Sequence, residues 1–299
     1  MKAPRIRTAL VVYKKSAWEQ HVTDKPGREI VDPAARRAML RAHKDNERAM
    51  VEVLRVLDGA GIKHHITARA ELAHPIPRKQ APDLIISIGG DGTFLAASHQ
   101  VSDGLILGVN SSPEHSVGFF CSCLRETFAA TLERSMKGTL PVLELHRLEV
   151  HINGERLPHL ALNDVLITHQ NPGATSRYAL RVGRTEELQR SSGLWISTAA
   201  GSTAGIRAAG GQVLPFTSDR IQYAVRELYV PPGEKPFKLR AGVVPKGGEI
   251  RVVCRMVDGA LFIDGPRHPI ELSIGDRIVI RRSRHPLHVL GLSRSRGRE

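Results

Sequence analysis

The segment that most restricts how this chain folds is residues 83–100, which read DLIISIGGDGTFLAASHQ. Leu84 to Ile88 form a continuous apolar run, which is typical of a strand covered on both faces. A glycine-rich turn follows at Gly89 to Thr93, and a helical pattern then runs from Thr93 to Val101. Glycines let backbone N–H groups approach a ligand closely, and a helix start adds partial positive charge. The segment predicts a phosphate-binding turn, with a plain strand-to-helix turn as the alternative.

The first 140 residues alternate between strand and helix patterns. Thr8 to Tyr13 is rich in β-branched residues, and a long helical pattern from about Pro33 to Asp58 follows it. Further strands are predicted near His65 to Ala68 and at Gly104 to Val109, and Phe128, Leu132 and Met136 then recur every four residues. This alternation predicts an α/β domain of Rossmann-like type, with a mostly parallel sheet covered by helices on both faces.

After about Pro141 the pattern changes to short strands separated by turn signals. Asn153-Gly154 and Asp258-Gly259 lie between apolar runs, and both dipeptides are strong hairpin signals. We therefore expect a β-rich, β-sandwich-like second domain. The predicted domains are residues 1–140 and 141–299, and the last ~25 residues either stay with the second domain or return to the first.

Charge and composition narrow the function classes. The chain carries 43 Lys and Arg against 30 Asp and Glu, a formal charge of +13, so its partners are expected to be anions. Aromatic residues make up only 4% of the chain, which favours nucleotide phosphates over single-stranded nucleic acid. No apolar stretch is long enough to cross a bilayer and no secretory signal is visible, so we expect a cytoplasmic protein without membrane contact.

The cysteines and histidines predict neither a disulfide framework nor a metal site. Cys121, Cys123 and Cys254 lack zinc-site spacing and are expected to be buried thiols. The pairs His64-His65 and His285-x-x-His288 have no acidic or thiol partner at ligand spacing.

Asp91 is the one ionisable group inside the glycine turn. A carboxylate there could accept the proton of an attacking hydroxyl, as acids do in phosphoryl transfer. The alternative role is a helix N-cap, because Asp favours that position. Asp91 is therefore the candidate catalytic residue.

Four ordered motifs resemble those of the NAD kinase family. They are GGDGT at 89–93, ALNDV at 161–165, SSGLWISTAAGSTA at 191–204, and the closing LFIDG, GDRIVIRR and HPL at 261–287. GGDGT alone is also shared by diacylglycerol and sphingosine kinases, so the later motifs decide the resemblance. It implies an ATP-dependent kinase that phosphorylates the 2'-hydroxyl of the adenosine ribose of NAD or NADH.

The resemblance also implies roles for individual residues. Asp91 would activate the 2'-hydroxyl, and Asn163 and Asp164 would hold adenosine and ribose groups. The residues implied at the phosphates are Gly89, Gly90, Gly92, Thr93 and Asn110, and those at NAD(H) are Asn163, Asp164, Gly201, Ser202, Thr203 and Ala204. A divalent ion such as Mg²⁺ would accompany ATP, without a dedicated metal site in the protein. A homo-oligomer, either a dimer or a tetramer, is implied as well.

Three departures from the common bacterial pattern point to a sub-branch. Ser192 stands where an Asp precedes Gly-Leu, Gly205 replaces a Tyr after Gly-Ser-Thr-Ala, and Asp164 replaces a Glu. These features resemble the plant-type NADH kinases and make the reduced cofactor a plausible acceptor. The sequence leaves open NAD⁺ against NADH as acceptor, and ATP against inorganic polyphosphate as donor.

Two other classes of function remain as alternatives. A lipid kinase sharing GGDGT would need a membrane-docking surface, and no long basic amphipathic helix is visible. A non-catalytic NAD(H) or nucleotide sensor, or a nucleic-acid-binding module, would bind without turnover. Neither alternative accounts for all four motifs.

Overall fold

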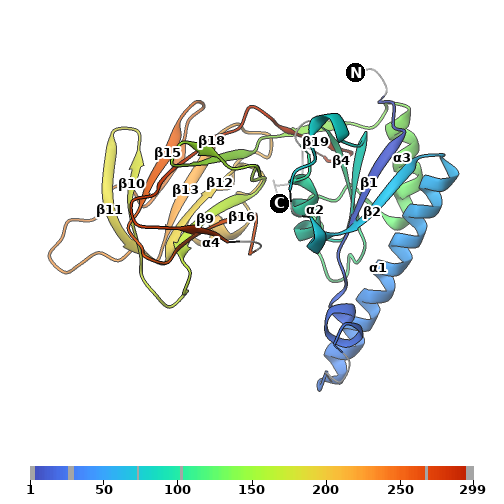
Figure 1. Cartoon of the computed structure of the whole chain (residues 1–299), viewed down its shortest axis with the longest axis horizontal. Helices are drawn as coiled ribbons and strands as arrows, with labels where there is room; N and C mark the ends of the chain where they lie inside the picture. The colour runs from blue at the N-terminus through green and yellow to red at the C-terminus, as the bar shows by residue number, and fades with distance from the viewer. Residues whose placement is uncertain (1–3, 26–29, 73, 102–103, 267–268, 294–299) are drawn as a thin grey trace. The chain divides into compact units, whose positions relative to one another are not determined.

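The computed structural model describes residues 4–25, 30–72, 74–101, 104–266 and 269–293. The chain forms two compact units, one spanning Met1–Leu143 and Leu287–Ser293 and the other spanning Glu144–Pro286 (Figure 1). We call them unit 1 and unit 2. Each has its own hydrophobic core.

Unit 1 is built around one sheet whose strand order is β2-β1-β3-β4-β19-β6, with β5 also paired to β4. Its strands are β1 (Thr8–Tyr13), β2 (Lys63–Ala68), β3 (Leu84–Ile88), β4 (Leu105–Asn110), β5 (Cys123–Leu124), β6 (Val142–Leu145) and β19 (Leu287–Leu290). Strands β1 to β5 and β19 pair in parallel, which confirms the predicted mostly parallel sheet. Its helices are α1 (Pro33–Gly59), α2 (Asp91–Ser98) and α3 (Phe128–Met136), with short helical turns η1 (Glu19–Thr23), η2 (Arg69–Glu71), η3 (Arg78–Gln80) and η4 (Arg125–Thr127).

Helix α1 has clear start and stop signals. The carboxylate of Asp32 accepts hydrogen bonds from the N–H groups of Ala34 and Ala35 at 3.0 and 3.1 Å, and Pro33 occupies the first helical position. The side chains that α1 buries recur every four residues, so one stripe packs on the sheet. They are Ala49, Val53 and Leu57, which share a core with Val11, Ile86, Leu107, Phe128 and Leu132.

Helix α2 begins two residues earlier and ends three residues earlier than the sequence pattern suggested. The carbonyl of Gly90 accepts from the N–H groups of Thr93 and Phe94, so the helix starts directly in the glycine turn at Asp91. Beyond Ser98 the backbone makes tighter three-residue bonds, which end the α-helix before Val101. The early start places Asp91 in the first turn of a helix.

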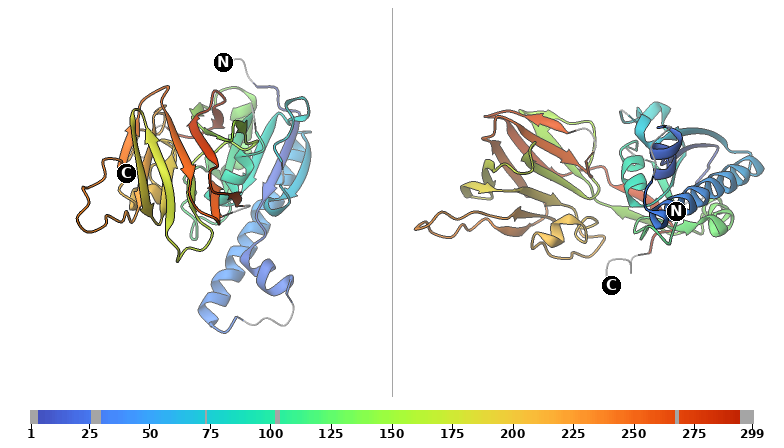
Figure 2. Two further views of the ribbon diagram at one scale, coloured as in Figure 1. Left: turned by 60° about the vertical axis from the view of Figure 1, so that its left-hand side comes forward. Right: turned by 90° about the horizontal axis from the view of Figure 1, so that it is seen from below.

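Unit 2 is a β-sandwich of two antiparallel sheets (Figure 2). One sheet has the order β11-β10-β15-β18-β7-β8 and contains β7 (Leu148–Ile152), β8 (Glu155–Arg156), β10 (Ser176–Val182), β11 (Thr185–Ser191), β15 (Glu249–Cys254) and β18 (Arg277–Arg282). The other has the order β14-β13-β12-β9-β16-β17 and contains β9 (Asp164–His169), β12 (Gly193–Ser197), β13 (Ile221–Arg226), β14 (Ala241–Val244), β16 (Gly259–Ile263) and β17 (Ile270–Leu272). A short helix, α4 (Gly205–Ala208), follows β12.

Apolar side chains from both sheets fill the space between them. The largest cluster joins Val150, Leu180 and Ile280 of one sheet to Ile167 and Ile196 of the other. This shared core confirms the β-sandwich predicted for the second half of the chain.

One of the two predicted hairpins is present and the other is wrong. Asn153 and Gly154 both adopt positive φ, 52° and 91°, as a two-residue turn between β7 and β8 requires. Asp258-Gly259 instead connects β15 in one sheet to β16 in the other. Close packing requires glycine at position 259, because a Cβ there would lie 2.9 Å from the sulfur of Cys254. Burial of both flanking strands inside the sandwich produced the apolar runs that suggested a hairpin.

Candidate active site

The predicted phosphate turn follows β3 at the carboxyl edge of the sheet in unit 1. Gly89 has φ 151°, and a Cβ at that position would lie 2.4 Å from Oγ1 of Thr93. A Cβ at Gly90 would lie 2.0 Å from Oγ of Ser116. Only glycine fits these positions without movement of a neighbour, so the backbone of the turn stays open to a ligand.

Thr93 lies beneath this turn and is 1% exposed. Among the described residues, its buried Oγ1 makes no hydrogen bond. A buried hydroxyl without a partner is costly in a folded protein. The Thr93 side chain thus fills the space that a side chain at position 89 would need.

Asp91 is half-buried at the start of α2, and its Oδ1 accepts a hydrogen bond of 2.9 Å from the N–H of Phe120. The N-cap of the helix is Gly90, so the alternative role of Asp91 as N-cap is wrong. The first turn of a helix favours negative charge. The carboxylate is thus fixed by a bond from the loop after β4 and lies beside the glycine turn.

Asn110 ends β4 and organises the loop that follows it. Its Nδ2 donates to the carbonyl of Ser116 at 3.0 Å, and its Oδ1 accepts from the N–H of Ser112 at 3.2 Å. Gly118 packs against the same amide. Asn110 therefore positions the loop that carries Phe120, and its direct contact with a nucleotide stays a prediction.

Two basic residues that the motifs did not identify lie level with the glycine turn. Tyr13 pairs with Ala68 on one side and with Ile88 on the other, so the next residues, Lys14, Arg69 and Gly89, leave three adjacent strands at the same height. A Cβ at Gly92 would lie 3.1 Å from Nη1 of Arg69. The chain continues from β1 to β2 on one side and from β3 to β4 on the other side. Open α/β sheets bind ligands at the carboxyl ends of two neighbouring strands whose connections diverge in this way.

Lys14 and Arg69 are both partly buried cations. Burial first, and then the positive charge of Arg69, lower the pKa of Lys14. Burial also lowers the pKa of Arg69. The positive charge of Arg69 thus lies close enough to disfavour the charged form of Lys14 beside the glycine turn. The sequence shows that Lys14 and Arg69 each directly follow a strand. It does not show that these two strands are neighbours in the sheet, and only the strand order brings the two residues together.

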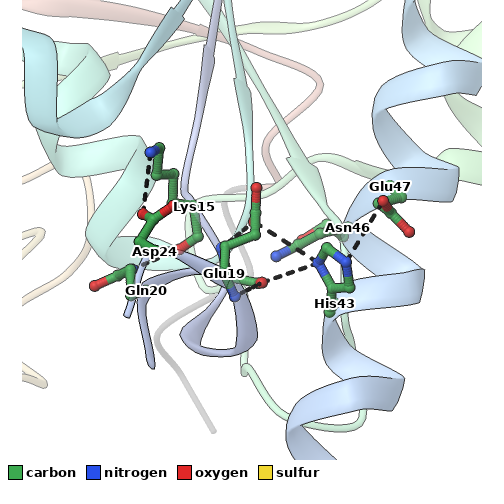
Figure 3. A network of polar contacts seen from close by, with 9 residues as sticks. Lys15, Glu19, Gln20, Asp24, His43, Asn46 and Glu47 are labelled. Carbon is green, nitrogen blue, oxygen red and sulfur yellow. Dashed lines mark hydrogen bonds and ion pairs between the residues drawn. The ribbon is translucent and has the colours of Figure 1, made fainter. Parts of the chain in front are cut away.

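A polar network, drawn in Figure 3, holds the chain after β1 against α1. Oγ of Ser16 lies 3.0 Å from Nδ1 of His43 on α1, and the N–H of Ser16 donates to the carboxylate of Glu19 at 2.6 Å. Nζ of Lys15 pairs with the carboxylate of Asp24 at 3.1 Å. The adjacent pocket of about 350 Å³ is lined by Tyr13, Lys14, Glu19, Asn46, Glu47, Met50, Val51, Ile66 and Ile88. This network fixes the segment that carries Lys14.

The second group of predicted residues lies in unit 2, where Asp264 clamps the start of β9. Its Oδ1 accepts from the N–H groups of Asn163 and Asp164 at 2.7 and 3.0 Å, and its Oδ2 accepts from Leu162 at 2.7 Å. Asp264 adopts φ 51° in doing so, which is uncommon for a residue other than glycine. Asp264 of the motif LFIDG therefore fixes the backbone of the motif ALND. The two motifs are about a hundred residues apart in the chain.

The side chains of Asn163 and Asp164 both place oxygen atoms in buried surroundings. Oδ1 of Asn163 is buried and has no hydrogen-bond partner among the described residues. Asp164 is 6% exposed, and burial together with the negative charge of Asp264 raises its pKa to about 7. A buried acid beside a like charge is a common feature of functional sites.

Asp164 gives stability an unusual pH dependence. Because its folded pKa lies above its unfolded value of about 3.9, its contribution to stability is present below pH ~4 and is lost as pH rises to about 7. We expect the melting temperature of Asp164→Asn, minus that of the parent protein, to be larger at pH ~8 than at pH ~5. Melting curves of both proteins measure this, with the exposed Asp258→Asn as control. An equal difference at both pH values would contradict the expectation.

The glycine and threonine-rich segment packs directly on Asn163. A Cβ at Gly201 would lie 2.2 Å from the carbonyl oxygen of Asn163, so this approach requires glycine. The N–H of Thr198 donates to the same carbonyl at 3.0 Å. The structure therefore brings Asn163 and Asp164 together with Gly201, Ser202, Thr203 and Ala204 in one cluster.

Ser202 has a structural task within that cluster. Its hydroxyl donates to the carbonyl of Ala199 at 2.7 Å and accepts from the N–H of Leu214 at 3.0 Å. It is 1% exposed. Ser202 closes the loop around α4, while Thr203 and Ala204 are half-buried at the start of that loop.

Comparison with known proteins identifies the family. No protein-family model matches the chain. It is 37% identical over 235 residues to a probable NADH kinase of Oryza sativa subsp. japonica, covering 71% of each chain. The chain belongs to the NAD kinase family. It is also 33% identical over 265 residues to an NADH kinase of Arabidopsis thaliana, covering 77% of this chain and 80% of that one. The resemblance to plant NADH kinases is therefore confirmed.

Solved NAD kinase structures share the fold. A crystal structure of an NAD kinase from Archaeoglobus fulgidus in complex with ATP has a TM-score of 0.67 at 21% identity, covering 97% of this chain and 96% of that one. Yeast NADH kinase complexed with NADH has a TM-score of 0.69 at 16% identity, covering 97% and 85%. Both support an NAD kinase fold of a parallel α/β unit and an antiparallel β unit.

The remaining predictions for this NAD kinase family member concern thiols, metals and membranes. Cys121, Cys123 and Cys254 are buried, as predicted. In the described part of the chain, no three His, Cys, Asp or Glu side chains group as metal ligands would. A bilayer-spanning helix was likewise not found among those residues.

Proposed function

We propose that this protein transfers the γ-phosphoryl group of ATP to the 2'-hydroxyl of the adenosine ribose of NAD or NADH. The observation that carries the proposal is the glycine turn of unit 1, with Asp91 fixed beside it and Lys14 and Arg69 at the same edge of the sheet. Membership of the NAD kinase family supports the identity of both substrates.

In the proposed step the 2'-oxygen attacks the γ-phosphorus of ATP in line with the leaving group. The new O–P bond forms as the bond from the γ-phosphorus to the β,γ-bridging oxygen breaks, and ADP leaves. The 2'-hydroxyl proton passes to the carboxylate of Asp91. The N–H groups of the glycine turn, with Lys14 and Arg69, would neutralise the charge on the transferred group.

Unit 2 would hold the dinucleotide. The unpartnered Oδ1 of Asn163 can accept from an amino group, and the carboxylate of Asp164 can accept from ribose hydroxyls. Hydrogen bonds from ribose would favour the ionised form of Asp164, opposing the effect of burial. This fits a raised pKa in the ligand-free protein.

A divalent ion such as Mg²⁺ would accompany ATP and supply positive charge beside its phosphates. Its ligands would come mostly from ATP and water, and the carboxylate of Asp91 is the acidic group at the turn. Use of NADH, a homo-oligomeric state and residence in the cytoplasm complete the proposal. The sequence similarity to plant NADH kinases favours the reduced acceptor.

A phosphorylation assay tests the proposal directly. Purified protein is incubated with Mg²⁺, with ATP or inorganic polyphosphate as donor, and with NAD⁺ or NADH as acceptor. We expect NADP(H) to form, with higher kcat/KM for NADH and with ATP as the better donor. If neither acceptor yields product, the kinase assignment is wrong and a sensor or lipid kinase role is tested next.

The two cations at the turn should act on ATP rather than on NAD(H). We expect Lys14→Met and Arg69→Met each to raise the KM for ATP by roughly 10-fold or more, since charge-assisted phosphate contacts are worth about 1.5–3 kcal/mol. The KM for the dinucleotide should change little. Lys15→Met is the matched control, because Lys15 pairs with Asp24 instead. Equal effects of Lys14→Met and Lys15→Met on ATP would remove Lys14 from the site.

A further inference from the structure

A pocket of about 440 Å³ in unit 2 is lined by Trp195 of the motif at 191–204 and by residues that none of the motifs contains. It is lined by Trp195, Gly205, Ala208, Ala209, Val225, Arg226 and Glu227. Gly205 directly follows Thr203 and Ala204, so the pocket continues the proposed NAD(H) site. Its volume is in the range of pockets that bind small organic ligands.

Trp195 and Gly205 are a matched pair. A Cβ at position 205 would lie 3.1, 3.4 and 3.5 Å from Cζ2, Cε2 and Cη2 of Trp195. A side chain at 205 would therefore require the indole to move. Gly205 on α4 therefore leaves room for the aromatic side chain of Trp195 on β12.

Ser192 and Glu227 form a second matched pair at the same pocket. Oγ of Ser192 donates a hydrogen bond to Oε2 of Glu227. Glu227 is exposed and adopts φ 44°, a conformation that costs a non-glycine residue free energy and clusters at functional sites. Ser192 stands where the common pattern has Asp, so Glu227 supplies a carboxylate at one hydrogen bond's distance from that position.

Arg226 completes the chemistry of the pocket. Its guanidinium carbon lies 5.8 Å from the centre of the Trp195 ring, within the range of a cation–π contact. The pocket thus combines two planar surfaces, the indole and the guanidinium, with one hydrogen-bond acceptor. A flat nitrogen heterocycle that carries an NH₂ group matches all three, because it can stack and donate at its edge.

We infer that Trp195, Arg226 and Glu227 form the binding surface for one heteroaromatic ring of the dinucleotide, either adenine or the carboxamide-bearing nicotinamide. This rests on the proposed function and names residues that determine its specificity. Trp195 stacks on the ring, and Glu227 accepts from the exocyclic NH₂ group. Ser192 would hold Glu227 through its hydrogen bond, and Gly205 would leave the space that the Trp195 indole occupies.

Intrinsic fluorescence tests the inference, since Trp18 and Trp195 are the two tryptophans of the chain. In the Trp18→Phe protein all tryptophan emission comes from Trp195, and in Trp195→Phe it comes from Trp18, which belongs to unit 1. Each protein is titrated with NADH, NAD⁺, AMP and nicotinamide mononucleotide, and binding is measured in parallel by calorimetry. We expect saturable quenching by the dinucleotides in Trp18→Phe and none in Trp195→Phe. The mononucleotide that reproduces the quenching identifies the ring.

Kinetic variants provide a second measurement. Loss of a stacked aromatic weakens base binding by about one order of magnitude, so Trp195→Leu should raise the KM for the dinucleotide roughly 10-fold. The KM for ATP should stay unchanged. Glu227→Gln retains an acceptor oxygen and should have a smaller effect than Glu227→Leu.

The outcomes separate this inference from the proposed function. If the dinucleotide binds and is phosphorylated while Trp195 emission and the Trp195→Leu KM stay unchanged, the inference is overturned and the kinase assignment stands. If the dinucleotide neither binds nor reacts, both are overturned. Quenching with binding but without turnover would support the ring site and overturn only the kinase assignment.

Discussion

Asp91→Asn should lower kcat by roughly 100- to 10,000-fold, the usual contribution of a positioned acid or base. Asn cannot take the 2'-hydroxyl proton, yet its side-chain oxygen can still accept the hydrogen bond from the N–H of Phe120. The loop after β4 should therefore keep its place. Steady-state kinetics with NADH and ATP, together with calorimetric binding of NADH, measure the effect.

The control for Asp91→Asn is Asp58→Asn, which removes the same charge from an exposed side chain near the end of α1. Asp58→Asn should leave kcat unchanged. Loss of NADH binding in Asp91→Asn would indicate a role in holding the acceptor. An unchanged kcat would remove Asp91 from the chemical step.

Gly201→Ala is expected to damage dinucleotide binding without affecting ATP binding. The new Cβ would lie 2.2 Å from the oxygen and 2.5 Å from the carbon of the Asn163 carbonyl, both backbone atoms that cannot rotate away. Overpacking of this kind typically costs about 1–3 kcal/mol. The segment carrying Asn163 and Asp164 must shift, so the KM for NAD(H) should rise by roughly 10-fold or more as the melting temperature falls.

Gly173→Ala is the matched control in unit 2. Its Cβ would meet Oδ1 of Asn171 at 3.4 Å, an ordinary contact, and Gly173 is exposed. It should leave both the melting temperature and the KM for NAD(H) unchanged. If Gly201→Ala behaves like Gly173→Ala, the close approach to Asn163 is not needed for the site.

Local signals in the sequence were enough for the elements that carry the glycine turn. The boundaries of β1 and β3 were predicted to the residue, and α1 to within one residue at each end. A fully apolar run marks a strand buried on both faces, and a capping Asp followed by Pro marks a helix start. Asp258-Gly259 misled because a turn dipeptide does not specify whether the next strand stays in the same sheet.

The residues that the motifs did not identify depend on neighbours that are distant in the chain. Lys14 and Arg69 became visible only once the strand order placed both beside Gly89. Asp264 was noted as part of a motif, but its role as a clamp on Asn163 and Asp164 required the fold of unit 2. A residue's charge or identity alone does not show which backbone it will meet.

The two kinds of domain, the glycine turn, Asp91 as candidate base and the kinase family could all be predicted from the sequence, because they follow from local periodicity and from motifs of adjacent residues. The tertiary structure alone decided which cations flank the turn, which carboxylate raises the pKa of Asp164 to about 7, and which aromatic ring fills the space beside Gly205. These depend on strand order and on packing between residues far apart in the chain. Such contacts are set by the whole fold, and no short segment encodes them.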